Sequence, residues 1–269
     1  MRSLDIAKGH GTRNDFVLFV DRDGLISLTD AEVAHLCDRR AGIGADGILR
    51  AVWASQVREW DGDPELWFMD YRNADGSIAE MCGNGLRVFL RYLDEEGLID
   101  STTEVPIATR AGLRVGRFNS DGTISVTMGA VQRGAAVDIN LAGRSWPAQS
   151  ADVGNPHAVV VLDSAAELAD LDLTEQPTWS PAGAFPRGVN VEFVVVEAPD
   201  ALRLRVHERG VGETESCGTG VVAAAATLAP NRRCQVTVPG GVLQVDTTGS
   251  QAILTGPAVV AGRGSFALS

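Results

Sequence analysis

Short apolar segments separated by turns set the hydrophobic pattern of this chain. Residues 16–20 and 158–162 are uninterrupted apolar runs of strand length, and residues 202–207 alternate between apolar and polar side chains. Alternation of this kind is typical of a strand with one buried face. Residues 66–71 have strand-like composition, and strand-like sequence with Gly and Asp turns returns at residues 124–128 and 236–245. We therefore expect a fold made largely of short strands.

Two segments have the pattern of helices, and each directly follows a cysteine. After Cys82, apolar side chains recur at helical spacing, and Gly97 supplies a plausible stop. After Cys217, residues 221–228 are apolar on every face and end just before Pro230, which predicts a helix that is buried all round. The first helix is expected to be amphipathic: its apolar positions are Leu86, Phe89, Leu90 and Leu93, and the positions between them carry Arg87, Arg91, Asp94 and Glu95.

The order of these segments repeats once along the chain. The sequence MCGNG surrounds Cys82 and SCGTG surrounds Cys217, and the two cysteines are 217 − 82 = 135 residues apart, about half of the 269-residue chain. Earlier in each half an asparagine, Asn14 or Asn155, stands before the first apolar run. Gly-containing turns followed by strand-like stretches come next, at residues 40–48 and 187–196. A duplicated unit with one thiol per copy gives this pattern.

The duplication predicts an α/β fold with two pseudo-symmetric domains, each with mixed or antiparallel strands around one central helix. We expect the first domain at residues 1–125, completed by a strand at residues 260–269, and the second at residues 126–259. The chain is long enough for two domains at roughly 150 residues each. Either half is large enough to bury a core of its own.

The charge balance narrows the classes of partner. The formal net charge is −12, whereas proteins that bind nucleic acids or anionic membranes need a basic surface. The start of the chain has no basic segment followed by a long apolar stretch. We therefore expect a soluble cytoplasmic protein that binds a small molecule or another protein.

Cysteine and lysine usage limits the possible cofactor chemistry. The four cysteines lie far apart without a CxxC pair, which favours neither a zinc site nor a small disulfide scaffold, and no metal is expected. Lys8 is the single lysine, so any Schiff-base cofactor would have to use it. Cys37 and Cys234 lack the setting of the other two and are interpreted as structural.

A cysteine at the start of a helix faces the unpaired N–H groups of the first turn and the positive end of the helix dipole. That environment favours a thiolate and also binds carboxylates. Glycines beside both cysteines let a ligand approach the backbone. Two such helix starts facing one another would suit racemisation, in which one thiolate removes an α-proton and the opposite thiol returns one to the other face. The alternative is a tight turn with a buried cysteine, and the occurrence of two matching copies argues against it.

Six motifs over essentially the full length of the chain resemble the diaminopimelate epimerase family and occur in the family's order. The resemblance implies a cofactor-independent epimerase that interconverts LL- and meso-diaminopimelate, a precursor of lysine and peptidoglycan cross-links. It also implies two similar α/β domains, each a strand barrel around a central helix, and a homodimer. The motifs are GTRNDFV, RAGIGADG, RNADGSIAEMCGNGLR, VGNPHAVV, RGVNVEF and ERGVGETESCGTG.

The resemblance also implies roles for individual residues. Cys82 and Cys217 are the acid and base pair, and Asn14 and Glu208 face the ammonium at the reacting centre. A second zwitterionic end of the substrate needs amide groups and a guanidinium. The carboxylate at the reacting centre is bound by Gly83, Asn84, Gly218 and Thr219, and the distal end of the substrate is bound by Asn73, Asn155, Asn190 and Arg209.

Other polar residues of the second half have two possible interpretations. His157 is either a loop histidine with a satisfied hydrogen bond or, as in the family, a residue that tunes the pKa of a catalytic thiol together with Glu208; we favour tuning. Glu208 and Arg209 could form a surface charge pair, but the family motif favours substrate binding. Two positions depart from the family, since Gly47 stands where glutamine is frequent and His207 where tyrosine or tryptophan is common.

Other functions remain open. A proline or hydroxyproline racemase typically has CGHG at the first cysteine, where this chain has Asn84, and lacks the distal set of residues. A phenazine-type isomerase would not keep both thiols. A thiol redox protein using Cys82 and Cys217 would leave the polar substrate set unexplained, and a binding protein that has lost its chemistry would not need two thiols.

Overall fold

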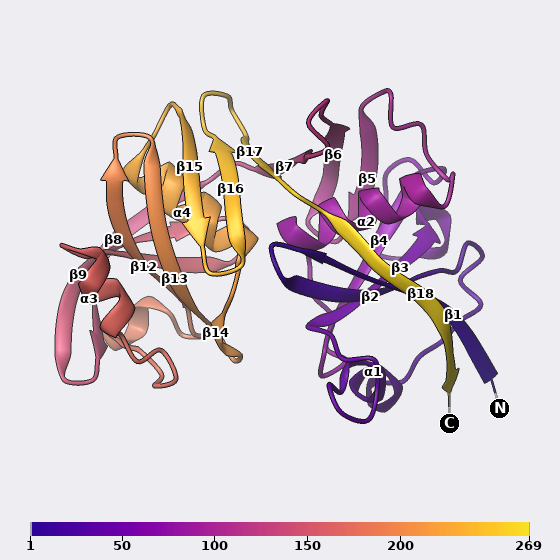
Figure 1. The fold of residues 1–269 in the computed structure, drawn as a ribbon, viewed down its shortest axis with the longest axis horizontal. Coiled ribbons are helices and arrows are strands. Elements are labelled where there is room, and N and C mark those ends of the chain that lie inside the picture. The colour runs from indigo at the N-terminus through magenta and orange to yellow at the C-terminus, as the bar shows by residue number, and fades with distance from the viewer. Residues whose placement is uncertain (1, 269) are drawn as a thin grey trace. The chain divides into compact units, whose positions relative to one another are not determined.

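The computed structural model describes residues 2–268, and the chain divides into two compact units (Figure 1). The first unit runs to Val126 and resumes at Gly256, while the second comprises Thr127–Thr255. No helix among the described residues is long and apolar enough to cross a membrane.

The first unit contains two helices and the strands that surround the longer one. Its strands are β1 (Arg2–Gly11), β2 (Asn14–Val20), β3 (Gly47–Trp53), β4 (Trp67–Asn73), β5 (Val105–Thr109), β6 (Gly112–Phe118), β7 (Ile124–Gly129, which reaches the boundary) and β18 (Val259–Leu268), and its helices are α1 (Asp30–Cys37), α2 (Gly83–Glu95) and the 3₁₀ turn at Ala54–Gln56.

The second unit has the same kind of composition. Its strands are β8 (Gln132–Leu141), β9 (Arg144–Asp152), β10 (Pro156–Val161), β11 (Thr178–Ser180), β12 (Asn190–Ala198), β13 (Ala201–Glu208), β14 (Gly212–Thr214), β15 (Arg233–Val238), β16 (Gly241–Asp246) and β17 (Ala252–Gly256), and its helices are α3 (Ala165–Asp170), α4 (Gly218–Leu228) and the 3₁₀ turn at Ala182–Ala184.

Strand pairing follows one scheme in both units. In the first, β18–β1–β2 is antiparallel, β2–β3 parallel, β3–β4 antiparallel, β4–β5 parallel, and β5–β6–β7 antiparallel. In the second, β8–β9–β10 is antiparallel, β10–β12 parallel, β12–β13 antiparallel, β13–β15 parallel, and β15–β16–β17 antiparallel. The two sequences of pairings are identical, so the predicted duplication and the predicted mixture of parallel and antiparallel strands are confirmed.

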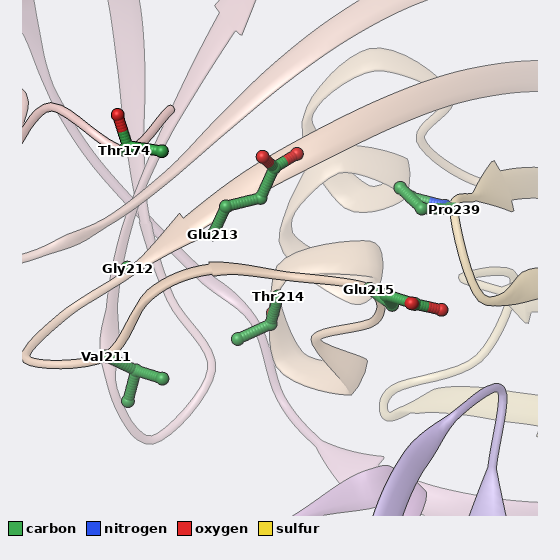
Figure 2. Close-up of a pocket in the computed structure, with 7 residues that line it drawn as sticks. All are labelled: Thr174, Val211, Gly212, Glu213, Thr214, Glu215 and Pro239. Atoms are coloured by element: carbon green, nitrogen blue, oxygen red, sulfur yellow. The ribbon is translucent and has the colours of Figure 1, made fainter. Parts of the chain in front are cut away.

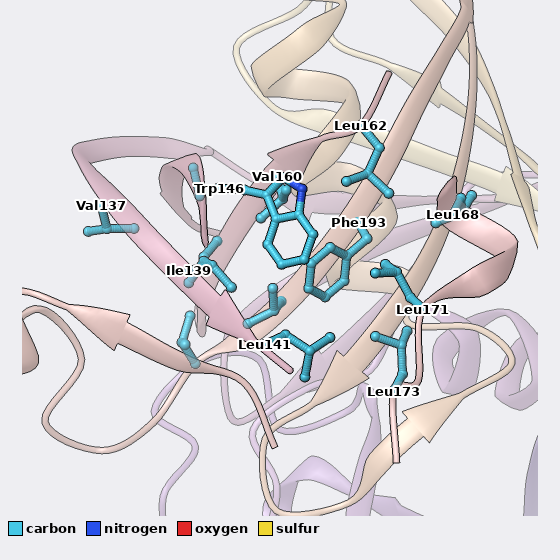
Figure 3. Packing of buried hydrophobic residues seen from close by; sticks show 14 of the residues in the cluster. Val137, Ile139, Leu141, Trp146, Val160, Leu162, Leu168, Leu171, Leu173 and Phe193 are labelled. Atoms are coloured by element: carbon cyan, nitrogen blue, oxygen red, sulfur yellow. The ribbon is translucent and has the colours of Figure 1, made fainter. Parts of the chain in front are cut away.

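Each unit places one helix in the middle of its strands. Helix α2 contacts β1, β2, β3, β6 and β18, and α4 contacts β9, β10, β12, β13, β15 and β16. Each of these helices is in contact with several strands of its own unit, so the predicted central helix is confirmed for both copies. In the second unit a separate apolar core packs Trp146 edge-on against Phe193, with ring centroids 5.7 Å apart (Figure 3).

The prediction of an amphipathic first helix is wrong at Arg87. Leu86, Phe89, Leu90 and Leu93 are fully buried as expected, but Arg87 is also 0% exposed. The strands surround the first turns of α2, so the polar face that the sequence indicates exists only toward its end, where Arg91 and Asp94 form an ion pair. Burial of α4 all round is confirmed up to Ala225, and its last turn is half-buried.

Candidate active site

Cys82 caps the N-terminus of α2, as the sequence predicts. Its backbone is extended (φ −138°, ψ 121°), and its thiol sulfur accepts a hydrogen bond from the N–H of Gly85 at 3.3 Å. The thiol also donates a hydrogen bond to Oδ1 of Asn14, at the start of β2, at 3.5 Å. The half-buried thiol therefore faces the first-turn N–H groups that favour a negative charge.

A hydrogen-bonded chain connects Asn14 to the buried guanidinium of Arg87. Asn84 Nδ2 donates to Asn14 Oδ1 at 3.3 Å, and Arg87 Nη2 donates to Asn84 Oδ1 at 3.0 Å. On the other side, Asn14 Nδ2 donates to Asp46 at 2.7 Å. Burial lowers the pKa of Arg87 to about 10, an effect that the nearby Cys82 opposes. Arg87 therefore remains a cation at neutral pH and supplies a fixed positive charge close to Cys82.

Asn73 and Gly47 form a neighbouring pair in the first unit. They are register partners in β3 and β4, and Asn73 Nδ2 donates to Ser77 at 3.0 Å. A Cβ at position 47 would lie 2.4 Å from the carbonyl oxygen of Arg72 and 2.8 Å from the ring of Tyr71. A longer side chain does not fit there, which gives a physical reason for the glycine in place of glutamine.

Cys217 stands at the equivalent position before α4, but its electrostatic setting differs from that of Cys82. The thiol is buried, and its sulfur lies 3.5 Å from the hydroxyl of Thr219. Burial raises the pKa of Cys217 well above its usual value, and the carboxylates of Glu208 and Glu192 raise it further; the Thr219 hydroxyl and the N–H of Gly220 act in the opposite direction. The protonated thiol is therefore the stable form.

The remaining polar residues of the second unit gather at the ends of β10, β12 and β13. Asn190 Oδ1 accepts from the N–H of Arg209 at 2.9 Å, and Asn190 Nδ2 donates to the carbonyl of Pro156 at 3.3 Å. Glu208, the last residue of β13, accepts a hydrogen bond from the hydroxyl of Thr214. Asn190 therefore fixes the backbone at Arg209, whose side chain is exposed.

His157 has both ring nitrogens in hydrogen bonds. Nδ1 lies 2.7 Å from Glu192 Oε1, and Nε2 lies 2.9 Å from Asn155 Oδ1. His157 and Glu192 are both 0% exposed. Sequence reasoning missed Glu192, although a signal was present: a single charged residue interrupts the apolar strand sequence VNVEFVVV.

Gly220 and Gly85 make room for protein side chains, which the sequence interpretation did not foresee. A Cβ at Gly220 would lie 2.5 Å from Glu192 Oε1, and a Cβ at Gly85 would lie 3.3 Å from the ring of Phe16. The second glycine of each motif therefore leaves room for a side chain packed against the helix.

His207, Cys37 and Cys234 are buried structural residues. His207 Nδ1 lies 3.0 Å from the carbonyl oxygen of Leu173, which supports the packing interpretation of this departure from the family. Burial raises the pKa of Cys37 to about 11, so this thiol stays protonated. Burial also raises the pKa of Cys234, so neither thiol is set up as a base.

A hollow of about 520 Å³ opens beside the segment that joins Glu208 to Cys217 (Figure 2). Figure 2 shows that the acidic side chains of Glu213 and Glu215 project at its edge. Its lining consists of Thr174, Val211, Gly212, Glu213, Thr214, Glu215 and Pro239. A second hollow, of about 400 Å³, lies in the first unit, where Asp70 forms ion pairs with Arg50 at 2.8 Å and with Arg110 at 2.7 Å. Neither hollow is lined by Cys82 or Cys217.

Comparison with known proteins identifies the family of this chain. The family model for diaminopimelate epimerase matches residues 6–134 and 149–261. Diaminopimelate epimerases from Streptomyces coelicolor (44% identity, 96% of this chain and 94% of that protein) and Thermobifida fusca (47%, 99% and 99%) are similar over their full length. The one from Corynebacterium glutamicum is 46% identical over 97% of this chain and 98% of that protein.

Solved structures show the same fold at low sequence identity. A phenazine biosynthesis protein of the PhzF family from Bacillus anthracis superimposes with a TM-score of 0.72 at 16% identity, covering 99% of this chain and all of that one. A probable proline racemase from Agrobacterium radiobacter superimposes with a TM-score of 0.70 at 15% identity, covering 99% and 93%. The fold and the relatives together define an isomerase. Within that class, the chain belongs to the diaminopimelate epimerase family.

Proposed function

We propose that this protein interconverts LL- and meso-diaminopimelate by two-base proton transfer at one α-carbon. The observation that supports this most directly is the presence of Cys82 and Cys217 at equivalent positions of a duplicated unit, each at the start of the central helix. A stereocentre is inverted when a proton leaves one face and another arrives on the opposite face, and two equivalent thiols suit that symmetry.

In the proposed reaction the thiolate of one cysteine removes the α-proton, so its S–H bond forms as the Cα–H bond breaks. The electron pair remains on the α-carbon and its carboxylate as a carbanion. The thiol of the other cysteine then gives its proton to the opposite face and becomes a thiolate. The N–H groups at the two helix starts stabilise the charge that develops on the carboxylate. Protons balance, and no cofactor takes part.

The unequal electrostatics of the two thiols support an assignment of resting roles. Arg87 places a positive charge near Cys82, whereas burial and two carboxylates favour the protonated form of Cys217. We propose that the free enzyme holds Cys82 as the base and Cys217 as the acid, and that each turnover exchanges these roles.

The substrate contacts are proposed from the family motifs. Gly83, Asn84, Gly218 and Thr219 would bind the reacting carboxylate, Asn14 and Glu208 would face the reacting ammonium, and Asn73, Asn155, Asn190 and Arg209 would bind the distal end. The exposed guanidinium of Arg209 and the half-buried amides of Asn73 and Asn155 support this division, because a distal carboxylate needs donors that it can reach.

The family resemblance supports three further proposals. The product would serve lysine and peptidoglycan precursor synthesis, the enzyme would work in the cytoplasm, and it would be a homodimer. Light scattering on the purified protein measures the last of these, and a monomeric mass would contradict it.

Solvent exchange at the α-carbon tests the proposed activity. The purified protein is incubated in deuterium oxide with LL-diaminopimelate and, separately, with proline, and the label and stereochemistry are followed by NMR. We expect deuterium in diaminopimelate together with the meso isomer, and none in proline. Exchange with proline alone would contradict the proposal and favour a proline racemase.

Cysteine variants test the mechanism. Cys82→Ser and Cys217→Ser should each lower turnover by at least about a hundredfold, since a serine hydroxyl is a far weaker acid and base, while Cys234→Ser serves as the matched control. If either active-site variant keeps full turnover and loses only a response to oxidants, the protein is a redox protein and not an epimerase.

A further inference from the structure

Glu192, whose charge helps to raise the pKa of Cys217, is a carboxylate in the core of the second unit. It lies on β12, is 0% exposed, and contacts His157 of the adjacent parallel strand β10 through the 2.7 Å Oε1–Nδ1 distance. Its second oxygen, Oε2, is buried and has no hydrogen-bond partner among the described residues. Burying an acid with one oxygen unsatisfied costs free energy of folding, so this residue calls for an explanation.

The fold itself does not require a polar pair at this place. The register of β2 with β3 matches that of β10 with β12, since Phe16 pairs with Gly47 as His157 pairs with Asn190. Leu49 lies two residues after Gly47 in β3, and Glu192 lies two residues after Asn190 in β12. The first unit therefore has Leu49 where the second has Glu192. Phe16 and Leu49 are both 0% exposed and pack on Gly85, as Glu192 packs on Gly220. An apolar pair fills the equivalent position in the first copy.

The hydrogen-bond geometry fixes where the hydrogens of the polar pair must lie. Each ring nitrogen of His157 faces an oxygen: Glu192 Oε1 on one side and Asn155 Oδ1, at 2.9 Å, on the other. An amide oxygen only accepts, so Nε2 must carry a hydrogen. A second hydrogen lies between Nδ1 and the carboxylate, whichever of the two atoms holds it. Without that hydrogen, two lone pairs would face each other at 2.7 Å.

We propose that Glu192 is a positioning residue that acts through His157 to orient the side-chain amide of Asn155. The Glu192–His157 pair holds Nε2–H toward Asn155 Oδ1 and thereby turns the amide NH₂ group outward. An outward NH₂ group donates to a carboxylate and rejects an ammonium, so the pair makes the distal subsite specific for the carboxylate of a second amino acid end. This inference rests on the proposed function, because it concerns the proposed ligand Asn155.

Nitrogen NMR of the imidazole tests the hydrogen arrangement without any substrate. Wild-type protein labelled with ¹⁵N histidine is compared with His157→Gln, which assigns the His157 signals among the four histidines. We expect Nε2 of His157 to have the shift and the proton coupling of a nitrogen that bears a hydrogen. A bare Nε2 would mean that the Asn155 NH₂ group faces the ring, and it would overturn the proposal whatever the protein's activity.

Asn155→Asp tests which group of Asn155 faces the substrate. The variant keeps an oxygen to accept from His157 and replaces the outward NH₂ group with an oxygen. For diaminopimelate we expect KM to rise roughly a hundredfold while kcat falls far less. An unchanged or lower KM would mean that an acceptor normally faces the substrate, and the proposal would be wrong.

A double variant copied from the first unit tests the pair itself. His157→Phe with Glu192→Leu reproduces the apolar pair that the fold already accommodates, so we expect the protein to fold. KM should rise about tenfold because the Asn155 amide is no longer held. The single variant Glu192→Gln, which keeps His157, should retain most of the affinity, since its amide can donate to Nδ1 and leave hydrogen on Nε2. A double variant with wild-type KM would contradict the proposal.

A control variant and the wild type distinguish a failure of the proposed function from a failure of the proposal about Glu192 and His157. Glu197→Gln changes an exposed acid on the same strand that pairs with Arg203, and it should leave KM and kcat unchanged. Wild-type protein that does not epimerise diaminopimelate would contradict the proposed function. In that case the NMR measurement still decides whether Glu192 and His157 hold the Asn155 amide as described.

Discussion

Cys82 and Cys217 are equivalent in the duplicated sequence but have opposite electrostatic surroundings. Five residues after the cysteine, the first helix carries Arg87 where the second carries Val222, and both are fully buried. A buried guanidinium lies near the thiol of Cys82, and two carboxylates lie near the thiol of Cys217. The two identical groups therefore have unequal electrostatic surroundings. In the proposed reaction both thiols transfer protons, and these unequal charges would decide which one begins as the base.

Replacement of Arg87 should therefore change the reactivity of Cys82 more than it changes stability. Arg87→Met keeps the volume of the side chain and removes a buried charge whose hydrogen-bond partners, Asn84 and Gly83, are neutral. Exchanging buried charges for apolar groups is often neutral or stabilising. We expect the melting temperature to be unchanged or higher, and alkylation of Cys82 by iodoacetamide at pH 7 to slow about tenfold.

Mass spectrometry of the Cys82 peptide measures that alkylation rate, and Arg91→Met is the matched control one turn further along α2. Arg91 is partly exposed and paired with Asp94, so its replacement should leave the rate unchanged. Equal alkylation rates in Arg87→Met and the wild type would show that Arg87 does not favour the Cys82 thiolate.

Asp15, next to Asn14 in β2, forms ion pairs with two cations, and its contribution to the free energy of unfolding depends on pH. Its carboxylate lies 2.5 Å from Lys8 and 2.8 Å from Arg39. Burial alone would raise its pKa, but hydrogen bonds from Arg39 and Lys8 outweigh burial and lower the pKa to about 2. Since an unfolded aspartate has a pKa near about 3.9, the stabilisation is complete above pH ~4 and is lost as the pH falls through about 2.

Asp15→Asn should therefore be less stable than the wild type at pH 6, and the difference should shrink between pH 4 and pH 2. Urea unfolding at pH 6, 4 and 2 measures the free energy of unfolding of both proteins. Asp61→Asn, at an exposed position, is the control. A difference that stays constant over this range would mean that Asp15 stabilises the protein without its charge.

At the scale of elements, the strands and both central helices are predictable because their apolar periodicity reflects burial directly. The exceptions are the charged residues that lie inside. Periodicity places Arg87 on a polar face, since the sequence does not reveal that the first turns of α2 are buried on that side too. The burial of Glu192 is not predicted for the same reason, because a charged residue within an apolar strand is normally taken to face solvent. The pairing of such residues depends on register between distant segments, which no local pattern contains.

The glycines after the cysteines show how one element limits another. Alanine in place of a helical glycine normally stabilises a helix by up to about 1 kcal/mol. At Gly220, however, the new Cβ would lie 2.5 Å from Glu192 Oε1 and 3.1 Å from its carboxyl carbon. We expect Gly220→Ala to lower the free energy of unfolding by about 1–3 kcal/mol through overpacking, as measured by urea unfolding.

Gly85→Ala is the matched comparison in the first unit. Its closest contacts, at 3.3 Å, are Cβ of Cys82 and the ring edge of Phe16, which need to move by only a few tenths of an ångström. We expect a loss of stability smaller than that of Gly220→Ala. If Gly220→Ala is as stable as the wild type, the Glu192 side chain has room to move, and the structure is looser there than described.

At the scale of the whole molecule, the two units differ in how the chain builds them. The second unit is continuous, from Thr127 to Thr255, and its pairing scheme runs from β8 to β17. The first unit takes β18 from the far end of the chain, where it pairs with β1 along nearly its whole length. In the second unit the strand that pairs with β9 is β8, its neighbour in sequence. In the first unit the equivalent strand, which pairs with β1, is β18 from the other end of the chain.

This difference predicts unequal behaviour of the two units as fragments. Residues 127–255 should fold alone, because this fragment keeps its paired strands, its central helix α4 and its own apolar core around Trp146 and Phe193 (Figure 3).

Residues 1–126 alone lack β18, so the edge of β1 and its buried side chains Leu4 and Ile6 would be exposed to water. We expect residues 127–255 to give dispersed amide NMR signals and a cooperative thermal transition, and residues 1–126 to aggregate or remain unfolded. Joining residues 256–269 to residues 1–126 through a flexible Gly/Ser linker should restore folding, since a flexible connection costs little entropy compared with the strand that it supplies. A folded 1–126 fragment would show instead that the first unit's core is sufficient without its terminal strand.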